Sequence, residues 1–310
     1  MFRVENAYLF LIPLLGIIVL FLRDKITVLA ILKDSRITRV IHYFLIYLFG
    51  ISLMIPQCKA FSEHLGSNLI NEIMFFIGLY FSALFAIVTN NLADVEIDQI
   101  SNRERPTIRG GMSSKSYLQF GILFLIISLT TGFLLGLTYF LILLGLTIIY
   151  YIYSCEPFRF KRIPILAKLL IGMNHLIICM GGFIAAGGEW EGFPIFWIIF
   201  ILVGISLSAN VIDIKDVEGD RIAGIKTLPV IFGTHRTRLF LSVVLILLYS
   251  SLIWYYNLLF LQLLVGSVGL IHIVFLLNTQ LKDKMLFLLH NTLFVGLIAL
   301  QFLSSTRHEI

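Results

Sequence analysis

Two short segments of the sequence place acidic side chains at helical spacing. The polar positions are Asn90, Asp94 and Asp98 in the first segment and Asp213, Asp216 and Asp220 in the second. Residues three or four apart project from one face of a helix, so each segment would present a stripe of oxygen ligands. Such a stripe repels itself unless a cation lies against it, and ligands that are all oxygen favour Mg²⁺ over Zn²⁺. The spacing therefore predicts a magnesium site.

Hydrated carboxylates at the end of an apolar helix are the competing interpretation of either segment alone. The recurrence of the pattern favours the metal site. Asp94 precedes Asp216 by 122 residues, and Asp98 precedes Asp220 by the same 122. Equal separations of this kind predict an internal parallel repeat, an arrangement also found in some transporter folds.

Basic residues accompany both acidic segments and also fill a loop at 153–162. The cations of interest are Arg103 after the first segment, Lys215 within the second, and Arg159 and Lys161 in the loop. Mg²⁺ and such cations together can hold a diphosphate. The alternative is that these residues only follow the general excess of Lys and Arg in the cytoplasmic loops of membrane proteins.

The composition indicates that a membrane protein must position these groups. The chain has 310 residues, of which 59% are hydrophobic and 13% charged, with a formal net charge of +5. An average soluble domain has about 25% charged residues, so soluble, disordered and collagen-like classes are excluded. The cations do not gather on a soluble surface, which argues against nucleic acid as a partner. The three cysteines are far apart and indicate neither a disulfide framework nor a zinc site.

Hydropathy predicts an all-α polytopic membrane bundle with ten spans. The candidate spans are about 7–22, 40–56, 69–90, 117–135, 137–153, 165–187, 193–212, 238–255, 257–277 and 285–304. With the N-terminus outside, 19 of the 23 Lys and Arg residues lie inside, as the positive-inside rule expects. Both acidic segments then face the cytoplasm. We expect one domain over residues 1–310, with no obligatory protein partner.

The motifs in these segments resemble those of the UbiA superfamily of intramembrane prenyltransferases. The stretch from Asn90 to Pro106 is similar to the family's N-D-x-x-D-x-x-x-D element and the N-R-x-x-R-P segment that follows it. The stretch from Asp213 to Gly233 is similar to the D-x-x-D-x-x-x-D element and its G-I-x-T-L-P tail. The loop at 153–162 resembles the family's Y-S-x-x-P-x-R-x-K-R stretch.

The resemblance implies a nine-helix core over residues 36–304. Residues 1–35 would then form an extra N-terminal transmembrane helix with an amphipathic linker. Two positions depart from the family pattern. Asn91 stands where many members have an aspartate, which removes one negative charge, and Arg109 adds a cation after the first segment.

The resemblance also implies roles for the polar residues. The Mg²⁺ ligands would be Asn90, Asp94, Asp98, Asp213, Asp216 and Asp220, and among them Asp94, Asp98, Asp216 and Asp220 are the predicted catalytic residues. The direct contacts to the donor's diphosphate would be Arg103, Arg159, Lys161 and Lys215. Departure of the diphosphate leaves an allylic carbocation, which an enclosed apolar chamber protects from water.

Four further residues are candidates for the acceptor or carbocation pocket. The aromatic faces of Tyr150 and Tyr153 can stabilise a cation. Asn174 and His175 lie within a predicted span, where polar residues are functional candidates. An interhelical hydrogen bond is the other interpretation of this pair.

The leading prediction is Mg²⁺-dependent transfer of a polyprenyl group from an isoprenyl diphosphate to a small aromatic acceptor, in quinone or related biosynthesis. Transfer to a non-aromatic acceptor such as a glyceryl phosphate lipid stays open. A cation-coupled transporter is a further alternative, although acidic residues at helix ends rather than in mid-membrane argue against it. The predicted partners are the diphosphate donor, the small acceptor and the lipid bilayer.

Overall fold

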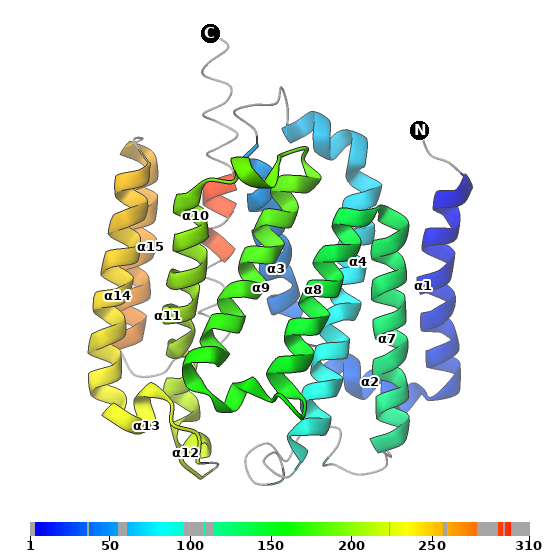
Figure 1. The fold of residues 1–310 in the computed structure, drawn as a ribbon, viewed down its shortest axis with the longest axis horizontal. Coiled ribbons are helices and arrows are strands. Elements are labelled where there is room, and N and C mark those ends of the chain that lie inside the picture. The colour runs from blue at the N-terminus through cyan, green and yellow to red at the C-terminus, as the bar shows by residue number, and fades with distance from the viewer. Residues whose placement is uncertain are drawn as a thin grey trace. The chain divides into compact units, whose positions relative to one another are not determined.

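All the regular secondary structure of the described residues is helical. The computed structural model describes residues 4–35, 37–54, 61–95, 99, 108, 114–222, 224–256, 259–277, 291–293 and 295–298. These residues contain thirteen α-helices (Figure 1). The chain divides into two compact units: unit 1 is Met1–Val40 with Ser62–Arg159, and unit 2 is Ile41–Phe61 with Phe160–Ile310. Each unit carries one of the two acidic segments.

Unit 1 is built from long apolar helices around one buried core. Its helices are α1 (Val4–Arg23), α2 (Lys25–Lys33), α4 (Phe61–Ala93), α7 (Ser114–Leu135) and α8 (Leu137–Ser154). The core joins Ile31 of α2, Phe85 of α4 and Tyr117 of α7. Large apolar side chains such as Leu118 and Ile126 stay exposed on α7, as a helix in contact with lipid requires. The two N-terminal helices are therefore part of the packing of unit 1.

Unit 2 contains the remaining elements. They are α3 (Ile37–Ser52), η2 (Phe160–Arg162), α9 (Pro164–Ala185), η3 (Trp190–Gly192), α10 (Ile195–Ile199), η4 (Phe200–Ile205), α11 (Ser206–Ser208), η5 (Ala209–Val211), α12 (Asp213–Ile222), α13 (Leu228–Phe232), α14 (Thr234–Tyr255) and α15 (Leu259–Leu277). Figure 1 shows α14 and α15 side by side as an antiparallel pair.

The second acidic segment follows a sharp bend in unit 2. The helical run over Ile195–Val211 contains the π-helical stretch η4 and is apolar, whereas α12 is bent from it by 67°. Six of the ten residues of α12 are charged. Charged side chains are costly in lipid, so the chain turns at the point where its composition changes. The bend thus holds the second acidic segment at the end of an apolar helical run.

Close contact between α3 and α9 depends on two glycines. A Cβ added to Gly50 of α3 would collide with the backbone carbonyl of Cys179, and one added to Gly182 of α9 would collide with the carbonyl of Tyr47. Small residues let two membrane helices approach until their backbones touch. This packing fixes the register between the buried polar residues of the two helices.

The structure supports part of the expectation of ten spans. Six helices of the described chain are long and apolar enough to cross a membrane, or seven if the bent pair of Ile195–Val211 and Asp213–Ile222 counts as one span. The N-terminal helix α1 has the roughly 20 residues of a span over Val4–Arg23, whereas α3 has 16 over Ile37–Ser52. The last predicted span, 285–304, is described only over 291–293 and 295–298, which are helical. Six or seven of the ten predicted spans are therefore supported within the described residues.

Candidate active site

The first acidic segment begins where α4 ends, and Arg159 binds it there. The Arg159 guanidinium donates hydrogen bonds of 2.9 Å to the Asp94 carboxylate and of 2.9 Å to the carbonyl of Ala93, the last residue of α4. Arg159 has a positive φ of 41°, a backbone conformation that residues other than glycine rarely adopt. Such strain persists where surrounding contacts enforce it, and functional sites concentrate it.

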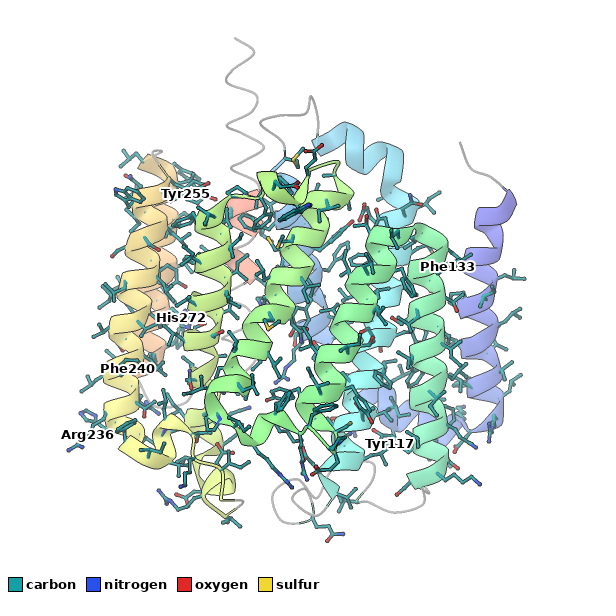
Figure 2. The ribbon with its side chains drawn as sticks, viewed as in Figure 1. Tyr117, Phe133, Arg236, Phe240, Tyr255 and His272 are labelled. Carbon is teal, nitrogen blue, oxygen red and sulfur yellow. The ribbon has the colours of Figure 1, made fainter. Side chains whose placement is uncertain are left out.

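Two asparagines just before Asp94 connect α4 to its neighbours. The side-chain amide oxygen of Asn90 accepts a hydrogen bond from the hydroxyl of Ser154 at the end of α8. The buried Asn91 amide donates to Asp34 after α2, at 2.9 Å, and to the Tyr117 hydroxyl, at 3.0 Å (Tyr117 is labelled in Figure 2). An aspartate in place of Asn91 would face the Asp34 carboxylate. The departure from the family pattern at this position therefore has a physical reason.

The second acidic segment has its own buried cation. Lys168, in the first turns of α9, places its ammonium group 2.6 Å from the Asp213 carboxylate. The side chains of Lys168 and Asp213 are 13% and 12% exposed. Burial raises the pKa of Asp213, and the nearby Lys168 charge opposes that shift. The other carboxylate oxygen of Asp213 is buried and receives no hydrogen bond from the described residues.

The carboxylates of α12 influence one another. Burial raises the pKa of Asp220 to about 6, the charges of Asp213 and Asp216 add to this rise, and a hydrogen bond from Thr227 opposes it. The helical prediction for the second segment is confirmed, since all three aspartates lie on α12. A bound cation would relieve mutual repulsion of this kind.

The stretch from the end of α8 to the first turns of α9 contains one cation for each acidic segment. Arg159 lies in the turn after α8 and binds the segment of unit 1, whereas Lys168 begins α9 and binds the segment of unit 2. Hydropathy places Lys168 only at a helix start, with no role. The sequence did contain an indication that Lys168 has a partner: it lies in an apolar helix, where a charged side chain needs a group of opposite charge.

The remaining predicted phosphate and metal ligands are only partly placed. Lys161 lies half-buried in η2, and Lys215 and Asp216 are exposed on α12. Asp98 and Arg103 fall outside the described residues. Within the described part of the chain, no group of three or more His, Cys, Asp or Glu side chains is placed to hold a metal ion. Neither unit by itself therefore presents a complete cluster, and the full ligand set stays a prediction.

The predicted pocket residues fall on two helices. Tyr150 and Tyr153 are half-buried near the end of α8 in unit 1. Asn174 and His175 are buried in α9 of unit 2. The His175 ring packs against two residues of α3 that sequence reasoning missed, with centroid distances of 5.4 Å to His42 and 4.9 Å to Tyr43. Both lie in the predicted span 40–56. A polar side chain within a span could have marked them as candidates.

The fold and the motifs define a known class of membrane protein. The structure of a UbiA homologue from Archaeoglobus fulgidus bound to GPP and Mg²⁺ superposes with a TM-score of 0.67 at 22% identity, covering 89% of this chain and 99% of that one. A structure described as giving insights into the biosynthesis of digeranylgeranylglyceryl phosphate synthase in membranes matches with a TM-score of 0.61 at 19% identity, covering 88% of this chain and 98% of that one. The fold is therefore the UbiA fold.

Sequence comparison identifies the family. Residues 60–295 match the UbiA prenyltransferase family, so the chain belongs to that family and is an integral multi-pass membrane protein. The digeranylgeranylglyceryl phosphate synthase of Pyrococcus horikoshii is 28% identical over 172 residues, which cover 55% of this chain and 60% of the relative. That of Methanosphaera stadtmanae is 30% identical over 173 residues, covering 54% and 61%. The chain thus spans about 60% of the length of these curated relatives. The resemblance found in the sequence is confirmed at the level of the family.

Proposed function

We propose that the protein is a Mg²⁺-dependent prenyltransferase that joins an isoprenyl group to the free hydroxyl of a glyceryl phosphate lipid. The names of the sequence relatives support this acceptor class, which the sequence had left open as the alternative. They favour it over the aromatic acceptor and over a place in quinone biosynthesis. The A. fulgidus homologue with GPP and Mg²⁺ supports an allylic diphosphate as the donor.

The observation that carries the proposal is the incomplete bonding of the two acid–cation pairs. Within the described residues, the second Asp213 carboxylate oxygen has no donor and the Arg159 Nε–H has no acceptor, although both atoms are buried. A buried polar atom without a partner is costly, so native structures leave few of them. A metal ion fits the carboxylate oxygen, and a phosphate oxygen fits the N–H. The residues present therefore suit Mg²⁺ and a diphosphate.

The residues of the chain would have three roles: some hold the metal ion, some contact the diphosphate, and some surround the allylic cation. Asp94, Asp213, Asp216 and Asp220, together with Asn90 and Asp98, would hold Mg²⁺, which when bound neutralises charge on the departing diphosphate. Arg159 would donate to phosphate oxygens, and Lys161, Lys215 and Arg103 would add positive charge near them. The half-buried rings of Tyr150 and Tyr153 would face the allylic cation. The apolar helices exclude water from it.

The test is a transfer assay with the full chain purified in detergent. Radiolabelled geranylgeranyl diphosphate would be supplied with Mg²⁺ and either a mono-geranylgeranylated glyceryl phosphate or a phenolic acceptor. We expect a lipid-soluble product with the glyceryl phosphate acceptor, and we expect EDTA to abolish it. Asp94→Ala and Asp213→Ala should lose the product. Glu218→Gln should keep it, because Glu218 is an exposed residue of α12 whose described contact is an ion pair with Arg221.

The alternatives predict different results from the same preparation. Product only with the phenolic acceptor would restore the aromatic assignment. Cation-coupled uptake into liposomes without any product would support a transporter. The prediction that the site faces the cytoplasm with the N-terminus outside can be tested by labelling single cysteines introduced at Lys215 and Val4 in sealed cells.

A further inference from the structure

Two aspartates of α12 each have one carboxylate oxygen bound by a donor from a neighbouring element of unit 2. The Lys168 ammonium of α9 donates to Oδ1 of Asp213 at 2.6 Å. The Thr227 hydroxyl, directly before α13, donates to Oδ2 of Asp220 at 3.0 Å. Asp213 is the first residue of α12 and Asp220 lies near its end, so the two donors bind opposite ends of the acidic segment. Each aspartate keeps one oxygen for a further ligand.

The ammonium group of Lys168 is fixed in place by two acceptors. Besides Asp213, it donates at 3.4 Å to the backbone carbonyl of Ala209 in η5. The side chains of Lys168 and Asp213 are nearly buried, so Asp213 cannot turn both oxygens toward one ion without breaking a buried ion pair, which is costly. Its Oδ2 atom is buried and accepts no hydrogen bond from the described residues. Asp213 is therefore held as a carboxylate that offers a single oxygen.

The Thr227 hydroxyl serves the Asp220 carboxylate rather than the backbone of its own helix. Thr227 is the N-cap residue of α13, which packs beside α12 (Figure 1), but its side chain makes no capping hydrogen bond. A threonine at an N-cap normally accepts a hydrogen bond from the backbone of the first turn. Thr227 is 6% exposed, so water does not compete for the hydroxyl. Its hydrogen bond is thus directed to Asp220.

The number of oxygens that a carboxylate offers separates Mg²⁺ from Ca²⁺. Ca²⁺ takes about six to eight oxygen ligands and often binds both oxygens of one carboxylate, whereas Mg²⁺ takes about six in an octahedron and keeps several waters. An oxygen that already accepts from a donor of the protein is a poorer ligand for a second cation. An ammonium group beside it also repels a divalent ion. Carboxylates limited to one oxygen therefore suit Mg²⁺ and withhold the extra ligands that Ca²⁺ needs.

We propose that Lys168 and Thr227 determine the metal specificity of the second acidic segment, favouring Mg²⁺ over Ca²⁺ by limiting Asp213 and Asp220 to one oxygen each. This inference rests on the proposed function, which assigns both aspartates to the metal. Lys168 and Thr227 are positioning residues, because they act through the carboxylates and do not bind the ion themselves. They belong to different elements, so two independent contacts impose the same restriction on α12.

The experiment measures ion binding to the full chain in detergent, without substrates. Mn²⁺ would be bound first, and Mg²⁺ or Ca²⁺ would then displace it, with the released Mn²⁺ followed by its electron paramagnetic resonance signal. The two displacement curves give the ratio of the Ca²⁺ and Mg²⁺ dissociation constants. This ratio does not depend on how much of a variant is folded, and loss of the Lys168 charge strengthens the binding of both divalent ions alike. We expect the wild type to prefer Mg²⁺ at least about tenfold.

Two variants release the restricted oxygens. Hydrogen bonds to charged groups are worth roughly 10- to 100-fold in an equilibrium constant, so Thr227→Val and Lys168→Met should each lower the preference for Mg²⁺ at least about fivefold. Thr227→Ser keeps the hydroxyl and should keep the preference. Thr237→Val is the matched control, because it removes a buried hydroxyl whose acceptor is the carbonyl of Gly233 in its own helix. This control should bind both ions as the wild type does.

The possible failures are separate. A preference that stays at the wild-type value in Thr227→Val or in Lys168→Met would overturn the role of that residue. A wild type that binds no Mn²⁺, or that binds Mg²⁺ and Ca²⁺ equally, would overturn the inference for both residues. The transfer assay on the same wild-type preparation tests the proposed function, which falls if no product forms with either acceptor.

Discussion

The ammonium group of Lys168 lies 2.6 Å from the Asp213 carboxylate, and both side chains are nearly buried. A buried ion pair of this kind is costly to break, because removal of one partner leaves the other charge without compensation. The pair also fixes the start of α9 against the start of α12. It therefore links the stability of unit 2 to the geometry of the second acidic segment.

Lys168→Met should destabilise the protein by about 3 kcal/mol and abolish transfer. The double variant Lys168→Met/Asp213→Asn removes both charges and should recover most of the stability but none of the activity. Chemical or thermal unfolding in detergent measures the first effect, and the transfer assay measures the second. Equal stability of the single and double variants would show that the pair is not coupled.

Arg159→Lys should lower transfer at least about tenfold although the charge is kept, because an ammonium group cannot reproduce the directed donors of a guanidinium. In the structure these donors reach Ala93 and Asp94 at the same time. Arg221→Lys is the matched control, since Arg221 forms an exposed pair with Glu218. A transfer rate of Arg159→Lys equal to that of the wild type would refute a directed role for this residue.

The stabilisation by Mg²⁺ should be larger at pH 7.5 than at pH 5. The pKa of Asp220 is raised to about 6, above its ordinary value of 3.8, so its favourable contribution to folding is present at low pH and is lost as the pH rises through 6. Mg²⁺ binds the ionised carboxylate and offsets this loss. The shift of the unfolding temperature on addition of Mg²⁺ at the two pH values measures the effect. Asp220→Asn should reduce the difference between them.

Asn91→Asp should destabilise unit 1, although it restores the residue that many family members have. The new carboxylate would face Asp34 at the position where the amide now donates at 2.9 Å, and it would be buried. Loss of one buried hydrogen bond and introduction of an unpaired charge cost about 1–3 kcal/mol or more. The double variant Asn91→Asp/Asp34→Asn should recover this loss in thermal unfolding. Failure of the second change to rescue the first would place the origin of the effect elsewhere.

Local periodicity predicted the long apolar helices and the helical placement of the second acidic segment. Three aspartates at spacings of three and four lie on α12 as expected, because side-chain direction in a helix follows from position alone. Contacts between distant residues were not predictable in this way. Lys168 meets Asp213 and His42 meets His175 only because the tertiary fold brings their helices together. The choice of acceptor came from relatives, since no residue pattern in the chain specifies it.

The contribution of α1 and α2 to the core has a consequence for any shortened version of the protein. Leu20, Val28 and Ile31 pack in the same core as Phe85 of α4, and Asp34 accepts the hydrogen bond from Asn91 one turn before Asp94. The N-terminal helices thus support the end of α4, from which the first acidic segment continues. Removal of residues 1–35 would take away these contacts. It should therefore lower the activity of the enzyme even though the deleted residues lie outside the acidic segments.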